Sequence, residues 1–212
     1  MTAVSAIIFD VDGTMLDTRE FILQSFEHAL SKHGFRISNF RERFAKIVGL
    51  PLADCYAALA PVSNVHALCD THREFQKQRF DLVAAYDGLI EVLSSLQKRG
   101  MKLGACSTRA SELRSSLKHA DVLHYFDAVI DGSEVTNHKP HPESVFKILE
   151  QLDIHPSQAV MVGDTPVDIH AGKAAKVAFT VGITHGFATE EQLDESGADK
   201  VVHSLRELLH FM

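Results

Sequence analysis

Two aspartates stand directly after an apolar stretch near the start of the chain. The stretch 3–9 is rich in Ile, Val and Phe, and Asp10, Asp12, Gly13 and Thr14 follow it closely. Such a stretch is typical of a strand buried on both faces of a parallel sheet, and ligands bind beyond the carboxyl ends of such strands. A plain turn after an N-terminal strand would use the same residue types, because Asp and Gly are common in turns.

Three further predicted strands are followed by polar side chains that could take part in chemistry. They are Ser107 and Thr108 after 101–106, Lys139 in the loop after 128–130, and Asp164 and Asp168 after 159–163. Because the carboxyl ends of parallel strands lie on one edge of a sheet, we expect these side chains to meet Asp10 and Asp12 in a single crevice.

Each of these signals also has a purely structural explanation. Ser107 and Thr108 could cap the helix that follows, and Thr165 with Asp168 fits the capping box [ST]-x-x-[DE]. Lys139 precedes a proline and could be an ordinary loop lysine. The occurrence of all of them in this order favours a shared site, in which Asp168 could serve both purposes.

The predicted crevice would be strongly acidic. Four carboxylates (Asp10, Asp12, Asp164, Asp168) and one ammonium (Lys139) sum to −4 + 1 = −3. A phosphate group would add roughly −1.5 to −2, and such charges repel one another strongly in a low-dielectric cleft. A hard dication with oxygen ligands would relieve this repulsion, which predicts a Mg²⁺ site that works together with a phosphate.

The order of predicted elements indicates an α/β fold with a helical insertion. From residue 85 onward strands and helices alternate, up to a strand at 177–181 and a helix at 205–209, which is typical of a parallel sheet with helices on both faces. Residues 17–84 show only helical patterns, near 17–33, 40–48, 53–59 and 65–80. We predict a Rossmann-like core of residues 1–16 and 85–212 and a small all-helical domain of residues 17–84, inserted after the first strand.

Local signals predict where several helices begin. Asp17 to Glu20 has the pattern of a capping box, and Asp87 is a candidate N-cap for a helix at about 89–98. Pro142 fits the first position of the helix that follows the loop with Lys139. We expect the core-facing side chains of this helix to include Phe146. A helix is also predicted at 110–120.

Composition limits the partners and the compartment. The chain has 212 residues, of which 45% are hydrophobic and 23% charged, and its net charge is −7. This argues for one full domain with a smaller insert and against a dedicated nucleic-acid or anionic-membrane surface. Three widely spaced cysteines and the lack of a recognisable signal peptide or transmembrane span predict reduced thiols in a cytoplasmic protein. We expect a monomer or a homodimer.

The polar residues at the strand ends resemble the motifs of a known enzyme family. D-x-D-G-T at 10–14, a serine at 107, Lys-Pro-His-Pro-Glu at 139–143 and G-D-T-x-x-D at 163–168 resemble the four motifs of the haloacid dehalogenase superfamily. The resemblance spans the whole chain. It implies a Rossmann-like catalytic core with a helical cap of the subfamily I type.

The resemblance implies a role for each residue. Asp10 would be the nucleophile that forms an aspartyl-phosphate, and Asp12 would protonate the leaving oxygen and then deprotonate water. Ser107 would donate a hydrogen bond to the phosphoryl group, and Lys139 would neutralise the negative charge of this group. A cis peptide bond between Lys139 and Pro140 would orient the lysine. Mg²⁺ would be bound by Asp10, the backbone carbonyl of Asp12, and Asp164. Asp168 would act through Lys139 or through a metal-bound water.

Substrate contacts are implied on both sides of the crevice. Gly13, Thr14 and Thr108 would line the phosphate site, although many family phosphatases have Asn where this chain has Thr108. Gly49-Leu50-Pro51 resembles the cap's specificity loop in phosphoglycolate phosphatase-like members, and a helix-to-helix turn explains it equally well. The side chains that precede it could meet a second anion of the substrate or form a solvated helix face: Arg41, Arg43 and Lys46.

The resemblance implies a magnesium-dependent phosphatase that acts on a small phosphorylated metabolite. The phosphoglycolate phosphatase-like branch is the closest, and Val181 to Phe187 supports it. A pyrophosphatase or nucleotidase is nearly as well supported, and a phosphosugar mutase similar to β-phosphoglucomutase shares the motifs. A dehalogenase needs neither the second aspartate nor the acidic fourth motif. A non-catalytic member would be expected to have lost one of the key residues, and all of them are present.

Overall fold

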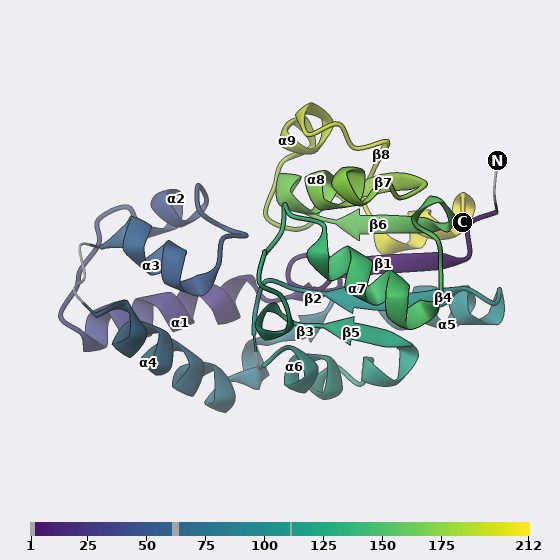
Figure 1. The fold of residues 1–212 in the computed structure, drawn as a ribbon. Coiled ribbons are helices and arrows are strands. Elements are labelled where there is room, and N and C mark those ends of the chain that lie inside the picture. The colour runs from purple at the N-terminus through teal and green to yellow at the C-terminus, as the bar shows by residue number, and fades with distance from the viewer. Residues whose placement is uncertain (1–2, 61–63, 111) are drawn as a thin grey trace.

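The computed structural model describes residues 3–60, 64–110 and 112–212. At its centre lies a six-stranded sheet with the order β5-β4-β1-β6-β7-β8, in which every neighbouring pair is parallel (Figure 1). The strands are β1 (Ala6–Asp10), β4 (Lys102–Cys106), β5 (Ala128–Ile130), β6 (Ala159–Gly163), β7 (Phe179–Ile183) and β8 (Lys200–Val202). The predicted α/β fold with a parallel sheet is confirmed.

Strand β1 is buried at every position because helices cover both faces of the sheet. Its side chains alternate: Ile7 and Phe9 face one hydrophobic cluster, and Ala6 and Ile8 face the other. The first cluster includes residues of α5 (Leu89–Lys98), α6 (Leu113–His119) and the 3₁₀ helix Leu205–His210. The second includes residues of α7 (Glu143–Leu152) and α8 (Pro166–Ala175). An uninterrupted apolar strand requires such double coverage.

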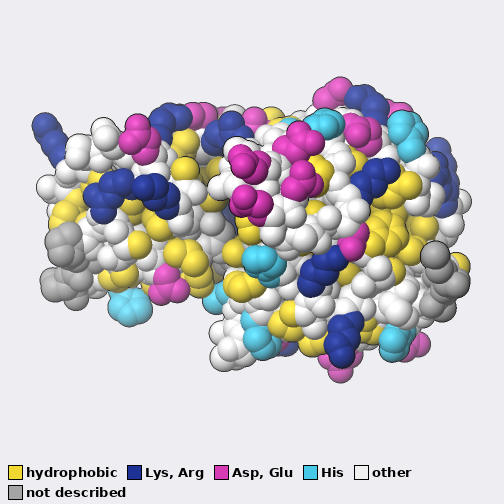
Figure 2. Space-filling model, turned by 90° about the horizontal axis from the view of Figure 1, so that it is seen from above, with side chains coloured by type: hydrophobic (Ala, Val, Ile, Leu, Met, Phe, Trp, Pro, Cys, Tyr) yellow, Lys and Arg dark blue, Asp and Glu magenta, His cyan; other side chains and the backbone are white. Residues whose placement is uncertain are grey.

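Four helices form a separate group beside the sheet, with a hydrophobic core of their own. They are α1 (Arg19–Lys32), α2 (Phe40–Phe44), α3 (Leu52–Leu59) and α4 (Val65–Gln78). Figure 2 shows the group as a lobe on the left of the molecule. A two-stranded antiparallel ribbon, β2 (Leu16–Asp17) with β3 (Ala84–Ala85), lies where the chain enters and leaves the group. None of the described helices has the length and apolarity needed to cross a bilayer.

The end of the sheet was predicted least well. Strand β7 begins at Phe179 and not at residue 177, and the predicted strands did not include β8. Helix α9 (Glu190–Glu195) was also missed, although Thr189 and Gln192 form a capping box that is visible in the sequence. Short elements are found in a sequence by a continuous apolar run, and β8 begins with an exposed lysine while only Leu193 of α9 is buried.

Three helices begin at residues other than those predicted, and in two cases other contacts hold the predicted cap. Asp17 lies in the ribbon, so the N-cap of α1 is Thr18. Asp87 accepts two hydrogen bonds from Arg206, and Gly88 is the N-cap of α5. Pro142 is the N-cap of α7, one position before the predicted place.

Other differences concern exposure and helix length. Phe146, expected in the core, is 45% exposed, and Ile148 is buried instead. Helix α2 ends at Phe44 rather than near residue 48. Helix α6 covers only part of the predicted segment 110–120, of which residue 111 lies outside the described residues.

A buried polar cluster lies inside the helical group. His72 of α4 is 3% exposed, and its ring nitrogens lie 3.0 Å from the hydroxyl of Tyr56 and 2.9 Å from Nε2 of Gln76. The Phe26 ring meets the imidazole edge-on. Burial, together with the smaller effect of the cations Arg109 and Arg73, lowers the pKa of His72 from 6.5 to about 3. The imidazole is therefore neutral in the folded protein at neutral pH.

We predict that acid destabilises the protein through His72. Between pH 6.5 and about 3 the unfolded chain binds a proton at this position and the folded chain does not. Each pH unit within this window therefore removes up to about 1.4 kcal/mol from the free energy of unfolding. Urea denaturation between pH 7 and pH 4 should show a weaker pH dependence for His72→Gln than for the wild type.

An exposed histidine of the same helical group provides the control. His28→Gln should retain the wild-type pH dependence because the position is solvated in both states. If the His72→Gln and wild-type proteins lose stability equally on acidification, the imidazole is not held neutral by its surroundings.

Candidate active site

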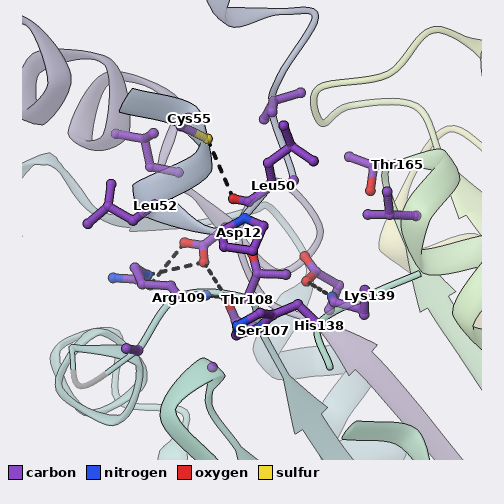
Figure 3. Close-up of a pocket in the computed structure, with 18 of the residues that line it drawn as sticks. Asp12, Leu50, Leu52, Cys55, Ser107, Thr108, Arg109, His138, Lys139 and Thr165 are labelled. Carbon is purple, nitrogen blue, oxygen red and sulfur yellow. Dashed lines mark hydrogen bonds and ion pairs between the residues drawn. The ribbon is translucent and has the colours of Figure 1, made fainter. Parts of the chain in front are cut away.

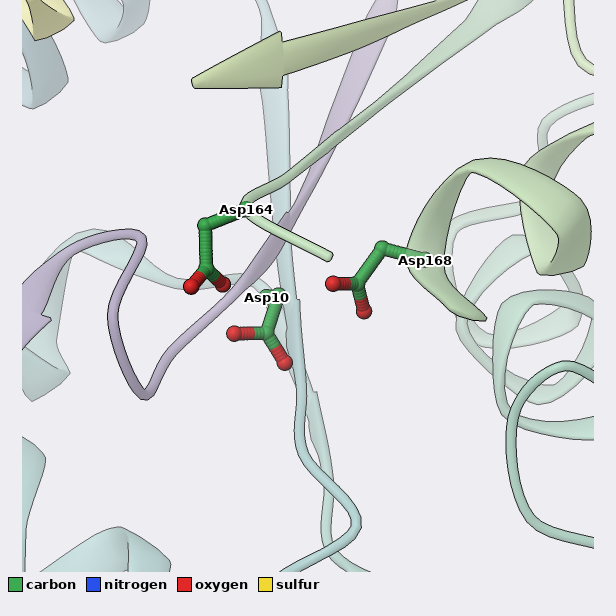
Figure 4. Close-up of side chains that lie close together, drawn as sticks. All are labelled: Asp10, Asp164 and Asp168. Atoms are coloured by element: carbon green, nitrogen blue, oxygen red, sulfur yellow. The ribbon is translucent and has the colours of Figure 1, made fainter. Parts of the chain in front are cut away.

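Three carboxylates from two strand ends and one helix converge at the carboxyl edge of the sheet. Asp10 ends β1, Asp164 follows β6, and Asp168 lies in the first turn of α8 (Figure 4). One oxygen of each lies within 4.8 Å of the others, and all three side chains are buried. The strand-end argument therefore places these residues correctly in space.

Lys139 connects two of these carboxylates. Its Nζ atom donates to Oδ1 of Asp10 at 2.5 Å and to Oδ1 of Asp168 at 2.6 Å, and its side chain is only 3% exposed. The bond between Lys139 and Pro140 is cis, as predicted. Burial opposes the charge on the ammonium, but Asp10 and Asp168 together hold the pKa of Lys139 well above its usual value.

Asp10 lies in a site that disfavours its negative charge. Burial raises the pKa of this carboxyl well above its usual value, and Lys139 acts in the opposite direction. The neighbouring carboxylates Asp168, Asp164 and Asp12 raise it further. The ammonium of Lys139 is therefore the main protein group that favours the ionised form of Asp10.

Asp164 is held by two donors from distant parts of the chain. Its Oδ1 atom accepts from the hydroxyl of Thr14 at 2.9 Å, and its Oδ2 atom accepts from the backbone N–H of Phe187 at 2.7 Å. Burial and the charge of Asp168 raise its pKa to about 7. We expected Thr14 to contact phosphate, but its buried hydroxyl orients a carboxylate in the structure.

Asp168 takes part in both of the roles considered from sequence. Its Oδ2 atom accepts from the backbone N–H of Thr165 at 3.1 Å and from its hydroxyl at 2.5 Å, which forms the capping box of α8. Its Oδ1 atom accepts from Lys139. A Cβ on Gly163 would lie 2.2 Å from Cβ of Asp168, so only glycine leaves room for this packing.

Asp12 has different partners from Asp10. Its Oδ1 atom lies 2.9 Å from Nη2 of Arg109, and its Oδ2 atom accepts from Nε of Arg109 at 3.1 Å and from the hydroxyl of Ser107 at 2.9 Å (Figure 3). The side chains of Asp12 and Arg109 are each 12% exposed. The side chain of Asp12 is thus turned towards Arg109, and a predicted metal contact of this residue would use its backbone carbonyl.

A cavity of about 390 Å³ lies between the helical group and the carboxyl edge of the sheet. Its walls include Asp10, Asp12, Ser107, Thr108, Lys139, Asp164 and Asp168, and also Gly49, Leu50 and Pro51 from the opposite side. The structure thus brings the predicted specificity loop to the same cavity as the catalytic candidates. Gly13 and Thr14 lie behind this surface, next to Asp164.

The three cations that precede the loop lie elsewhere. Arg41 pairs with Glu20 and is 60% exposed, and Arg43 donates to the carbonyl oxygens of Ala58 and Leu59. Neither these residues nor Lys46 is among the described residues that line the cavity. The solvated-face interpretation describes their positions better.

Sequence reasoning missed two contributors to the site. Arg109 follows Ser107 and Thr108 at the end of β4, and a cation at this edge of an acidic crevice was a signal that we did not use. The loop at Gly186 and Phe187 holds Asp164 through the backbone N–H of Phe187. Every residue type except proline has such a donor, so the sequence gives no signal for this contact. A Cβ on Gly186 would lie 2.1 Å from Oδ2 of Asp164.

We predict that Gly13→Ala damages the site more than it strains the backbone. Gly13 has φ +86°, and a Cβ at this position would lie 2.3 Å from Oδ2 of Asp164. The left-handed conformation alone costs alanine roughly 1–2 kcal/mol. The contact should add to this loss and displace Asp164, which would lower any metal-dependent turnover by about tenfold or more.

Gly100→Ala is the matched control for this substitution. Gly100 has φ +78°, and beyond its chain neighbours a Cβ added there would have no atom of the described residues within 4 Å. It therefore carries the same strain without the contact. Urea denaturation and activity assays should show a moderate loss of stability and full activity for this variant. Equal stability and equal activity of the two variants would show that the contact with Asp164 is unimportant.

Comparisons with known proteins agree with this arrangement. The family model described as haloacid dehalogenase-like hydrolase matches residues 7–181. The pyrophosphatase PpaX of Bacillus pumilus is 32% identical over 210 residues, which cover 98% of this chain and 96% of that protein. The pyrophosphatase PpaX of Bacillus cereus (strain ATCC 10987 / NRS 248) is 34% identical over 186 residues, with coverages of 84% and 85%.

Solved structures show the same fold. A predicted phosphoglycolate phosphatase from Haemophilus somnus superposes with a TM-score of 0.90 at 19% identity, covering 99% of this chain and 98% of the other. The β-phosphoglucomutase of Clostridium difficile superposes with a TM-score of 0.84 at 21% identity, with coverages of 97% and 93%. The family match, the two relatives and the motif geometry lead to one conclusion: this chain belongs to the haloacid dehalogenase-like hydrolases.

Proposed function

We propose that this hydrolase is a magnesium-dependent phosphatase that transfers a phosphoryl group from a small metabolite to Asp10. The observation that carries the proposal is the contact of Lys139 with both Asp10 and Asp168, beside Asp164 and at the wall of a cavity. This arrangement combines a nucleophile, a cation that neutralises a phosphoryl group, and a carboxylate cluster able to bind a metal.

The carboxylate cluster fits Mg²⁺. Asp10, Asp164 and Asp168 against Lys139 leave −3 + 1 = −2 in a buried site. The raised pKa values of Asp10 and Asp164 show how strongly the protein alone opposes this charge. Three buried carboxylates supply the hard oxygen donors that Mg²⁺ prefers. We propose Asp10 and Asp164 as its ligands, together with the backbone carbonyl of Asp12. The bound ion would stabilise the negative charge that develops on the transferred phosphoryl group.

In the proposed reaction a carboxylate oxygen of Asp10 attacks phosphorus, and the bond to the leaving oxygen breaks. Asp12 supplies a proton to that oxygen and later removes one from the water that hydrolyses the aspartyl-phosphate. Lys139 neutralises the charge on the phosphoryl oxygens. Ser107, whose hydroxyl donates to Asp12 in this structure, would donate to the phosphoryl group when substrate is bound. Asp168 positions Lys139 and takes no direct part.

The helical group, residues 17–84, would act as a cap over the cavity. Its residues Gly49, Leu50 and Pro51 line the side opposite the carboxylates. A cap that excludes water during the first transfer would protect the reaction from premature hydrolysis. The chain passes from the sheet to the helical group at β2 and returns at β3, and the ribbon that these strands form is where a hinge would lie.

The substrate is proposed from the relatives and the cavity. We propose a small phosphorylated metabolite, and the relatives named pyrophosphatase make pyrophosphate the first compound to assay. Phosphoglycolate, implied by the sequence motifs, comes second. A sugar phosphate with its bisphosphate activator would test the mutase alternative.

The three cysteines Cys55, Cys69 and Cys106 are free and buried, which fits the cytoplasmic location that we propose.

Asp10→Asn should abolish hydrolysis without unfolding the protein. The amide cannot form the acyl-phosphate, so kcat should fall roughly 10³-fold or more. Because burial disfavours the charge on Asp10, the neutral variant should be at least as stable as the wild type. Phosphate release from pyrophosphate, phosphoglycolate and p-nitrophenyl phosphate, with magnesium and with a chelator, provides the measurement. A folded variant with wild-type rates would rule out Asp10 as the nucleophile.

Magnesium should stabilise the protein through Asp164. A ligand that binds only the folded state at 100 times its Kd adds about 2.7 kcal/mol to the free energy of unfolding. Thermal melts with and without magnesium should show this increase in the wild type, and Asp164→Asn should largely abolish it. Asp121→Asn, at a side chain 93% exposed, is the control that should respond normally. A full magnesium response in Asp164→Asn would place the ion elsewhere.

A further inference from the structure

Arg109 is a largely buried cation of the cavity that pairs with Asp12 and not with the cluster of Asp10, Asp164 and Asp168. Among the described residues that line the cavity, the lysines and arginines are Arg73, Arg109 and Lys139. Lys139 is bound to Asp10 and Asp168, and Arg73 pairs with Asp70 with its side chain 43% exposed. The Arg109 side chain is 12% exposed. A second anion in this cavity would find its strongest partner at Arg109.

The guanidinium of Arg109 is held in place from three sides. Nη1 donates to the hydroxyl of Ser116 on α6 at 2.7 Å, and Cζ lies 5.4 Å from the centre of the Phe21 ring on α1. Nε and Nη2 face the two oxygens of Asp12 at 3.1 Å and 2.9 Å. Such contacts pre-organise the group, so little conformational entropy is lost when it binds an anion.

Arg109 lies next to the place that the leaving group would occupy in the proposed reaction. In an in-line transfer to Asp10 the leaving oxygen lies opposite Asp10, within reach of the proton donor Asp12. Whatever is bonded to that oxygen therefore lies beside Asp12, where Arg109 is found. The transferred phosphoryl group would instead lie at Asp10, next to the ammonium of Lys139.

We propose that Arg109 recognises a second anionic group on the leaving side of the substrate. The substrate class is a phosphate anhydride or ester whose leaving group carries a phosphate or a carboxylate close to the scissile oxygen. Because Asp12 faces Nε and Nη2 in this structure, such an anion would take the place of this carboxylate on the guanidinium or bind the second hydrogen of Nη1, through charge-assisted hydrogen bonds. The inference rests on the proposed phosphatase function and adds a specificity residue to it.

For pyrophosphate the steps balance without a further reactant. An oxygen of Asp10 bonds to one phosphorus, and the bridging P–O bond breaks. Its electron pair stays on the leaving phosphate, which takes the proton of Asp12 while Arg109 neutralises its charge. Water then attacks the aspartyl-phosphate and gives a proton to Asp12, which restores both aspartates.

The test compares substrates with and without the second anion. The value of kcat/KM is measured for pyrophosphate, phosphoglycolate and p-nitrophenyl phosphate, whose leaving group carries no anionic substituent. We expect Arg109→Met to lower the ratio of either substrate with two anionic groups to p-nitrophenyl phosphate by about 10- to 150-fold, the range for a lost charged hydrogen bond. Arg109→Lys should recover part of this loss. The more affected of the two ratios identifies phosphate or carboxylate as the preferred anion.

Arg41→Met is the matched control. It removes an arginine that pairs with Glu20 away from the cavity, so the ratios should stay at their wild-type values. Thermal melts establish that each variant is folded. If Arg109→Met and Arg109→Lys lower the rates with all three substrates equally, Arg109 only positions Asp12 and the inference is wrong.

A binding measurement separates this inference from the proposed function. Calorimetry with magnesium compares methylenediphosphonate, which carries two anionic groups, with methylphosphonate, which carries one. The wild type should bind the former more tightly, and Arg109→Met should lose most of this preference. Equal affinities in the wild type would overturn the inference even if esters are hydrolysed. An Arg109-dependent preference without any hydrolysis would support the anion site and reject the proposed reaction.

Discussion

The site depends on the burial of three carboxylates around one ammonium. Asp10, Asp164 and Asp168 lie at 6%, 0% and 2% exposure, and Lys139 at 5%. Removing such ions from water costs several kcal/mol each, and this cost is offset only when the geometry is good and the remaining lone pairs accept hydrogen bonds. The rest of the structure must therefore hold these four side chains firmly, and a dication would lower the repulsion among them.

The parallel sheet meets this demand with groups that come from distant parts of the sequence. Strand β1 lies between β4 and β6, so the ends that carry Asp10, Ser107 and Asp164 are neighbours. Two of the carboxylates are then fixed by further donors: Thr14 and Phe187, distant in sequence, donate to Asp164, and Thr165 donates to Asp168. Glycines stand where a Cβ would strike these carboxylates: Gly13, Gly163 and Gly186.

The sequence predicted what depends on local pattern and strand order. Buried strands such as Ala6–Asp10 and Ala159–Gly163 have continuous apolar runs, and the residues that follow them meet because the strands are parallel. The short elements β8 and α9 were missed because neither has such a run: β8 begins with an exposed lysine, and Leu193 is the buried residue of α9. The pair formed by Asp12 and Arg109 joins residues 97 positions apart, and no local pattern specifies which carboxylate such a cation will bind.

Two aspartates separated by a single residue thus lie in different environments. Asp10 shares the ammonium of Lys139 with Asp168 in a fully buried cluster, whereas Asp12 has a guanidinium and a serine hydroxyl at the cavity wall. Such a difference in surroundings would allow two identical carboxyl groups to take the proposed roles of nucleophile (Asp10) and proton donor (Asp12).

The surroundings of Asp12 also involve the helical group. Arg109 lies over Phe21 of α1, so a movement of this helix would alter the support of the guanidinium that holds Asp12. Among the described residues, the side chains bound to Asp10, the proposed nucleophile, directly or through Lys139, come from loops and helices that follow strands of the sheet, since Lys139 follows β5 and Asp168 follows β6. In the proposed reaction a movement of the helical group would therefore act on the proton transfer by Asp12 and on the leaving group, and would leave the contacts of Asp10 unchanged.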